Sequence, residues 1–456
     1  MKRLFLLVAL FSALCISCSD KDDNKGKKPQ QPVENPGNGN VNGNDEIVSI
    51  PNNEIWYTTS DNKKLFPNST EPVNFGAILL SNTYVDGQGV LVFDDDITLI
   101  GDSVFSGCST LTTISIPNSV TVIGSSAFSG CTSLKGVYIS DLSAWLRIDF
   151  ANSSANPLYY TENLYLNNKA VAELVIPSDI TEIKPYAFFS CSCLTSVIIS
   201  DNVVAIGEGA FYNCRSIESV TISESVNTIG NYAFRGCSSL INVNIPDSVI
   251  TTGEGVFWGC NDLSNVIIGD GLNTIGDYAF YECYSLTNVA IGDGVTAIGE
   301  NAFYHCTGLT EVTIPDIVTT IGWHAFDGCS ELMSVTIGDG VTTIGSYAFE
   351  ECRGLKSLTI GDSVTTIEYA AFSGCSSLVS VTIPGSITAI AGDAFYNCGS
   401  LTSVYCKATT PSMGAASMFH NNAPDRKIYV PMESVDAYKS ASYWKNYADA
   451  IVGYDF

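Results

Sequence analysis

Cysteines at a constant spacing of 23 residues are the feature that most restricts how this chain can fold. Ten of them follow one another at this interval from Cys191 to Cys398, and Cys108 and Cys131 form a further pair with the same spacing. A repeat period between about 20 and 50 residues is the signature of a solenoid. The 456-residue chain is therefore interpreted as one repetitive array, although its length alone would suggest about three domains.

Other residue types keep a fixed place relative to these 12 ladder cysteines. Phe lies three residues before the cysteine in all 12 units, and Ala or Val lies four before. Leu lies three residues after it in 11 units, with Ile217 in the twelfth, and Ile lies eight after it in 11 units, with Cys406 in the twelfth. Each column must stack on itself from coil to coil, so the columns predict one continuous core.

A single repeat predicts two short strands and a turn. Val243 and Ile245 alternate with polar residues, which places them on one face of a strand. Residues 295–299 form a second β-rich segment, and the run through Phe303 to Cys306 is expected to be a turn of 3₁₀ or α helix. Neighbouring coils should lie about 4.8 Å apart, the distance between paired strands.

One insertion interrupts the ladder. The interval from Cys131 to Cys191 is longer than two repeats, and one complete repeat can be recognised within it, with Asn168 at the cysteine place. The remaining residues of the interval are therefore one insertion, which is placed near residues 131–167. Because the insertion contains Trp145 and Phe150, we expect it to pack on the solenoid.

The N-terminal segment indicates export. Residues 1–17 have a basic start and an apolar run too short to span a bilayer, as in a signal peptide. Small residues before Cys18 resemble a bacterial lipobox, although Cys15 stands where Leu is usual, and plain cleavage or retention is the alternative. The acidic run after Cys18 resembles the export signal of Bacteroidetes lipoproteins, with a solvated charge run as the other interpretation. Residues 18–46, rich in Asn, Gly, Pro and Lys, are expected to form a flexible tether.

The repeat closely resembles the BspA-type leucine-rich repeat over residues 85–406. The resemblance implies a β-rich α/β solenoid, a right-handed superhelix of 23-residue coils, with caps at residues 47–84 and 407–456. The second cap should contain a strand at 427–430 and a helix over 434–451. The family includes bacterial adhesins that bind host matrix proteins or other bacteria, and members without a known ligand. The resemblance thus implies a cell-surface lipoprotein of the outer membrane but names no ligand.

Charge and residue types exclude several classes of function. With 21 basic and 47 acidic residues, the net charge of -26 argues against nucleic acid and against docking on anionic lipid, so membrane contact is expected only through the N-terminal lipid. The three histidines lie in no nucleophile motif, and the 23-residue cysteine spacing matches no zinc pattern. We therefore expect a monomeric protein that is not an enzyme and has no cofactor. The ladder cysteines are expected to be buried free thiols rather than disulfides. The redox states of Cys193 and Cys406 stay open.

A column of carboxylates lies ten residues after the ladder cysteine. Its favoured role is to cap turns by accepting local backbone N–H groups, and weak Ca²⁺ binding is the alternative. The calcium candidates are Asp247, Asp270, Asp293, Asp316, Asp339 and Asp362.

Large aromatic residues recur at two further positions. Two residues before the cysteine lie Phe189, Tyr212, Trp258, Tyr281, Tyr304 and Tyr396; five before it lie Tyr186, Tyr232, Tyr278 and Tyr347, with Trp323 one place earlier. Both positions flank the buried Ala-Phe pair, so the aromatics are expected on the outer face, where they could bind extracellular protein or glycan. Packing of the rings on one another is the alternative. Two classes of function stay open: an adhesin-like binding module, and a structural spacer or surface-coat component without a specific ligand.

Overall fold

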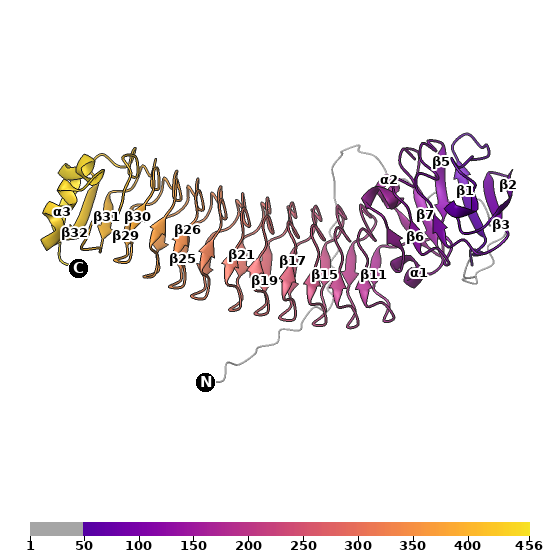
Figure 1. The fold of residues 1–456 in the computed structure, drawn as a ribbon, viewed down its shortest axis with the longest axis horizontal. Helices are drawn as coiled ribbons and strands as arrows, with labels where there is room; N and C mark the ends of the chain where they lie inside the picture. Colours follow the sequence, from indigo (N-terminus) through magenta and orange to yellow (C-terminus); the bar gives the residue numbers. More distant parts are fainter. Residues whose placement is uncertain (1–48) are drawn as a thin grey trace, which may run out of the picture.

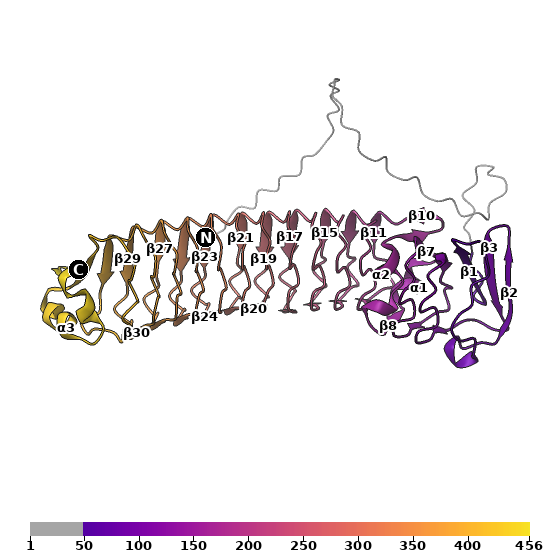
Figure 2. The same cartoon turned by 90° about the horizontal axis from the view of Figure 1, so that it is seen from above.

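The computed structural model describes residues 49–456 and shows a long rod of stacked coils with a cap at each end (Figure 1). The signal peptide, Cys18 and the tether lie outside the described residues. Each coil contributes one strand to a long-strand face and one to a short-strand face, and these faces run along two opposite edges of the rod (Figure 2). The fold class expected from the sequence is confirmed.

Strands in successive coils pair in parallel, and each residue lies beside its equivalent in the next coil, as Val243 does beside Val266. The long-strand face contains β11 (Glu173–Val175), β13 (Ser196–Ile198), β15 (Ser219–Thr221), β17 (Asn242–Ile245), β19 (Asn265–Ile268), β21 (Asn288–Ala290), β23 (Glu311–Ile314), β25 (Ser334–Ile337), β27 (Ser357–Thr359), β29 (Ser380–Ile383) and β31 (Ser403–Cys406), preceded by β5 (Leu111–Ser115), β7 (Gly136–Ile139) and β9 (Leu164–Leu166). The short-strand face contains β4 (Leu99–Ile100), β6 (Val122–Ile123), β8 (Asp149–Phe150), β12 (Glu182–Ile183), β14 (Ala205–Ile206), β16 (Thr228–Ile229), β18 (Thr251–Thr252), β20 (Thr274–Ile275), β22 (Ala297–Ile298), β24 (Thr320–Ile321), β26 (Thr343–Ile344), β28 (Thr366–Ile367) and β30 (Ala389–Ile390).

The third side of each coil is a run of turns, and the helical turn expected there is absent from every ladder coil among residues 49–456. The reason lies in the backbone hydrogen bonds, which alternate in direction. The N–H of Phe280 donates to Ala302 O in the next coil at 2.8 Å, whereas the N–H of Tyr281 donates to Tyr278 O within its own coil at 3.1 Å. A helix would need every N–H to bond within the segment, so stacking of the coils prevents a helix.

The core columns are arranged as the sequence predicts. The ladder Phe, Ala and Leu side chains are buried, and the Phe rings stack along the rod, with centroids of Phe257 and Phe280 5.5 Å apart and those of Phe280 and Phe303 5.2 Å apart. All 12 ladder cysteines are buried free thiols, and Cys406 is buried too.

The N-terminal cap is an antiparallel sheet. It consists of β1 (Glu54–Thr59), η1 (Pro72–Asn74), β2 (Leu79–Val85) and β3 (Gln88–Phe93). The cap therefore runs past the expected boundary at residue 84, because β3 pairs with both β1 and β2. Strand β1 also pairs antiparallel with β5 and thereby closes the first coil.

The C-terminal cap departs from the single helix expected over residues 434–451. The chain forms β32 (Lys427–Pro431), η3 (Met432–Ser434), α3 (Val435–Ser440), η4 (Trp444–Ala450) and β33 (Ile451–Tyr454). Strand β32 pairs with the last coil and β33 pairs with β32, both in parallel. Tyr438 and Trp444 are buried and cover the end of the core.

The insertion packs on the solenoid. It contains α1 (Leu142–Leu146), η2 (Ser153–Ala155) and α2 (Leu158–Thr161), and its hairpin consists of β9 and β10 (Lys169–Ala170). Trp145 is buried and its Nε1 donates to Ala187 O at 3.0 Å. Asn168 does not take the buried place of a ladder cysteine, because it lies exposed in the left-handed turn of the β9–β10 hairpin.

Every third coil carries a proline that interrupts the long-strand face. The prolines that recur at this interval of three repeats are Pro177, Pro246, Pro315 and Pro384. Within a group of three coils the pairing is regular: four residue pairs join β23 to β25, and three join β25 to β27. Pairing is interrupted at three places. No ladder pairing joins β21 to β23 or β27 to β29, and only a single pair joins β15 to β17. The cause is visible at an equivalent position: the N–H of Gly338 donates to Ile314 O at 3.0 Å, whereas Pro315 has no N–H to donate to Ile291. We call these three interruptions the proline seams.

Candidate functional site

The aromatic side chains lie together along the turn side of the rod. We define the aromatic band as the residues two and five places before the ladder cysteines, with Trp323 beside them. Neighbouring rings pack on one another, as the alternative expected, and most of them also stay partly exposed. The ring centroids of Tyr281 and Tyr304 are 4.7 Å apart, and that of Trp258 lies 4.8 Å from Tyr281.

Exposure differs along the band. Trp323 is 47% exposed and Tyr396 37% exposed. The expectation is wrong for Phe189, which is 8% exposed because it is stacked between Tyr159 and Tyr212. The remaining candidates are half-buried: Tyr186, Tyr212, Tyr232, Trp258, Tyr278, Tyr281, Tyr304 and Tyr347.

A cation lies inside the band. Arg235 takes the place of an aromatic residue two before Cys237, and its guanidinium carbon lies 3.7 Å from the Trp258 ring centroid and 5.4 Å from that of Tyr212. A guanidinium between aromatic faces is attracted by their quadrupoles. The band therefore offers hydrogen-bond donors as well as flat apolar surface.

The tyrosines five places before the cysteine are held in a strained backbone conformation. Tyr232, Tyr278 and Tyr347 have φ angles of 55°, 57° and 59°, in the left-handed region where a side chain costs about 1 kcal/mol or more. The equivalent residues Gly209 and Gly255 adopt the same conformation without this cost. Tyr at these positions thus opposes local stability, which favours a role for the ring outside its own coil.

Two acidic residues interrupt the band and face a histidine. Asp327 and Glu350 lie two places before Cys329 and Cys352, and His324 lies five before Cys329. The Nδ1 atom of His324 is 2.6 Å from Asp327 Oδ2, and one ligand atom from each of the three residues lies within 4.8 Å of the others. Burial raises the pKa of Asp327 to about 7, raises that of Glu350 and lowers that of His324. The sequence analysis missed this cluster, although the loss of the aromatic pattern in two successive coils could have marked it.

The carboxylate column caps the neighbouring coil rather than its own turn. The Oδ1 atom of Asp247 accepts the N–H of Asp270 at 2.9 Å, and Oδ1 of Asp270 accepts the N–H of Asp293 at 2.9 Å. The expected local bonds are therefore replaced by bonds between coils. Asp316 and Asp339 accept in the same way from Asp339 and Asp362. One oxygen of each of these four side chains is thus already used.

The long-strand face offers a flatter surface. Thr313, Thr336 and Thr359 are exposed in successive strands, as the alternation of the sequence predicts. At the proline seam between β21 and β23 the surface opens into a groove of about 660 Å³, lined among others by Ala290, Glu311 and Asp316.

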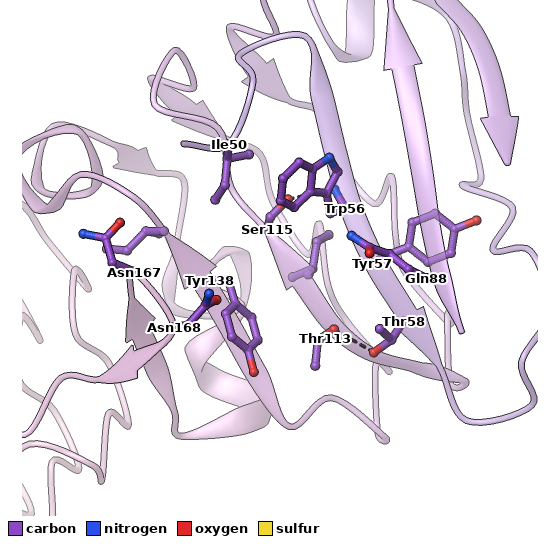
Figure 3. Close-up of a pocket in the computed structure, with 12 residues that line it drawn as sticks. Ile50, Trp56, Tyr57, Thr58, Gln88, Thr113, Ser115, Tyr138, Asn167 and Asn168 are labelled. Carbon is purple, nitrogen blue, oxygen red and sulfur yellow. Dashed lines mark hydrogen bonds between the residues drawn. The ribbon is translucent and has the colours of Figure 1, made fainter. Parts of the chain in front are cut away.

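A smaller pocket lies between the N-terminal cap and the insertion. Figure 3 shows Trp56, Tyr57 and Gln88 on one side of this pocket, and Tyr138 with the amides of Asn167 and Asn168 on the other side. Its free volume of about 20 Å³ holds about one water molecule. The pocket is thus too small for a sugar ring without movement of its walls.

Cys193 differs from the ladder thiols. Its Sγ atom lies 3.3 Å from that of Cys191, and a hydrogen bond from the Cys191 thiol lowers the pKa of Cys193. Burial raises the pKa of the ladder thiols, for example Cys131 to about 12. Among the thiols of residues 49–456, Cys193 is thus the one best suited to react.

Parallel coils of constant length with stacked Phe, Leu and Ile columns and a cap at each end define a leucine-rich-repeat solenoid. The chain belongs to the family of the BspA type leucine rich repeat region, whose model matches six copies over residues 89–164, 160–287 and 296–424. This finding confirms the family that the sequence resembled.

Solved structures of bacterial leucine-rich-repeat proteins are similar to this chain. A leucine rich cell surface protein of Faecalibacterium prausnitzii is 28% identical, with 57% of this chain and 87% of that chain covered and a TM-score of 0.31. A leucine-rich repeat protein of Bacteroides ovatus is 22% identical, with 82% and 90% covered and a TM-score of 0.43. No curated protein matches the chain significantly. Within residues 49–456, no helix has the length and apolar character needed to cross a bilayer.

Proposed function

We propose that this protein is an adhesin-like binding module that engages an extracellular protein or a glycan through its aromatic band. The observation that carries the proposal is the line of rings from Trp258 through Tyr281 to Tyr304, which is half-exposed on three successive coils. Aromatic and Arg side chains are the residues that contribute most to binding energy at interfaces. Strained tyrosines nearby support the proposal, because a purely structural turn would favour Gly.

Display at the cell surface is part of the same proposal. We infer that a lipid on Cys18 anchors the chain in the outer membrane and that residues after it hold the solenoid away from the surface as a monomer. The similarity to a leucine rich cell surface protein supports this location. Protease added to intact cells should remove the solenoid, and Cys18→Ala should release the protein from the membrane. Protection of the solenoid in intact cells would contradict surface display.

The band is tested by replacing Trp258, Tyr281 and Tyr304 together with Ala and measuring binding to a panel of immobilised matrix proteins and glycans. Binding should weaken far more than in any single variant, because an extended site distributes its contacts over several coils. The matched control makes the same triple change to Ala at Thr313, Thr336 and Thr359, which are exposed on three successive strands of the long-strand face. Circular dichroism should show that both variants keep the fold.

The same experiment separates the alternatives. If the threonine set weakens binding and the aromatic set does not, the long-strand face with its groove is the binding surface. If the wild-type solenoid binds nothing on the panel, the structural spacer is the better interpretation, in which the rings serve only to pack the turns together.

A further inference from the structure

The interruption of the aromatic band has a chemical pattern of its own. Two residues before the ladder cysteine, six coils carry an aromatic side chain, but two neighbouring coils carry Asp327 and Glu350. In the column five before the cysteine, His324 stands where four other coils carry Tyr. The two columns adjoin each other on the turn side, so these departures fall at one place.

We propose that His324, Asp327 and Glu350 bind a divalent transition-metal ion of the zinc class. The three ligand atoms lie within 4.8 Å of one another, and His324 Nδ1 lies 2.6 Å from Asp327 Oδ2. Bonds of about 2.0–2.1 Å in a tetrahedral shell place ligand atoms roughly 3.3 Å apart. The separation of 2.6 Å and the upper limit of 4.8 Å lie on either side of this value. The proposal goes beyond the proposed function and stands without it.

The ligand set selects the class of metal. An imidazole nitrogen together with carboxylate oxygens suits Zn²⁺ and its transition-metal neighbours, whereas Ca²⁺ and Mg²⁺ take oxygen ligands. Three protein ligands leave at least one position for water or for a donor from a partner molecule. The sequence analysis found no zinc pattern in the cysteine spacing and expected no metal beyond weak Ca²⁺ binding; this proposal places a metal site in the turn columns instead.

The surroundings favour a bound cation. Asp327 is 7% exposed, and within residues 49–456 no Lys or Arg forms an ion pair with Asp327 or Glu350. The adjacent Arg353 pairs with Glu351 at 2.6 Å, so the basic side chain paired with this cluster is His324, 2.6 Å from Asp327.

The imidazole is also held in orientation. The ring of His324 stacks on that of Tyr347, with centroids 4.6 Å apart and an interplanar angle of 7°. Trp323 lies on another side, with its ring centroid 4.5 Å from the imidazole. Supporting contacts of this kind hold a metal ligand in place before the ion arrives.

The test is titration of the reduced full-length protein with Zn²⁺ by calorimetry and with Co²⁺ by visible absorption. We expect one ion per chain, with His324→Ala and Glu350→Gln each weakening binding at least about ten-fold, since even outer-shell changes cost that much. Glu351→Gln is the matched control, because this neighbouring carboxylate pairs with Arg353, and it should bind as the wild type does. Circular dichroism checks that each variant is folded.

Four results would overturn the proposal. The first is wild-type binding weaker than millimolar for both ions. The second is equal affinity of the wild type, His324→Ala and Glu350→Gln. The third is loss of the bound ion in a Cys193→Ser variant, which would place the metal at the Cys191–Cys193 thiols instead. The fourth is competition by equimolar Ca²⁺, since the oxygen-only carboxylate column would then explain binding.

Discussion

The Sγ atom of Cys283 donates a hydrogen bond of 3.2 Å to the carbonyl oxygen of Phe257, in the preceding coil. The same bond recurs along the rod, for example from Cys306 to Phe280 at 3.1 Å. The Phe257 carbonyl also accepts the backbone N–H of Cys260 at 3.1 Å. A small apolar side chain with a weak donor is what this place requires, which explains why Cys recurs in a chain whose described cysteines are free thiols.

We expect the thiols to differ sharply in reactivity. Because burial raises the pKa of Cys283, its thiol stays protonated and inert in the folded protein. Cys193 has a lowered pKa and is partly exposed. As the pH is raised, its labelling by iodoacetamide should therefore increase already below pH 8.5, since about 8.5 is the pKa of an ordinary thiol. Mass spectrometry after brief labelling measures both, and Cys193→Ser is the control. Equal labelling of Cys283 and Cys193 in the folded state would contradict this assignment.

Removal of one stacked ring should destabilise the rod locally. Phe280→Ala is expected to cost about 3–5 kcal/mol, as for a fully buried aromatic residue. Hydrogen exchange should quicken first in its own coil and in the two coils whose rings it contacts, because each coil touches only its neighbours. Phe66→Ala, at a residue 75% exposed, should leave thermal unfolding unchanged. An unchanged melting temperature in Phe280→Ala would refute the role of the column.

Residues within one column were predictable from the sequence, and relations between columns were not. Phe280 could be assigned to the core because the same residue type recurs at one register. The cluster of His324 with Glu350 required knowledge that two turn columns adjoin across coils. The missing helix had a similar cause, because the N–H of Phe280 bonds to the next coil, a contact that no local propensity describes. Pro315 was visible in the sequence, but prolines at this position recur only in every third coil, so a comparison of single 23-residue repeats did not reveal them as a pattern.

The carboxylate column can be tested by separating its charge from its hydrogen bond. Asp270→Asn keeps an oxygen that can accept the N–H of Asp293 and removes repulsion of roughly 1 kcal/mol between neighbours, so stability should be equal or higher. Asp270→Ala removes the acceptor and should cost about 1 kcal/mol. Chemical denaturation followed by circular dichroism compares the two. If added Ca²⁺ stabilises the wild type but not Asp270→Asn, the calcium alternative is the better explanation.

The proline seams should be visible in hydrogen exchange. Amides of β23 that face β21 lack ladder partners, so they should exchange faster than amides of β25 that face β23. In Pro315→Gly the new N–H can donate to Ile291 O, and exchange across this seam should slow towards the rate within the group β23–β25–β27. Uniform exchange along the wild-type face would show that the seams are closed in solution.

The proline seams affect only one face of the rod. Where β21 and β23 are unpaired, β22 and β24 of the same two coils remain paired, and β28 remains paired to β30 beside the seam between β27 and β29. The array is therefore built like a row of stiff plates, each three coils or about 14 Å deep, joined at each seam through the paired short strands. Under shear, such a row bends at the seams and opens on the long-strand face. The core strands within each plate then carry little of the load, and the long-strand face can follow a curved surface.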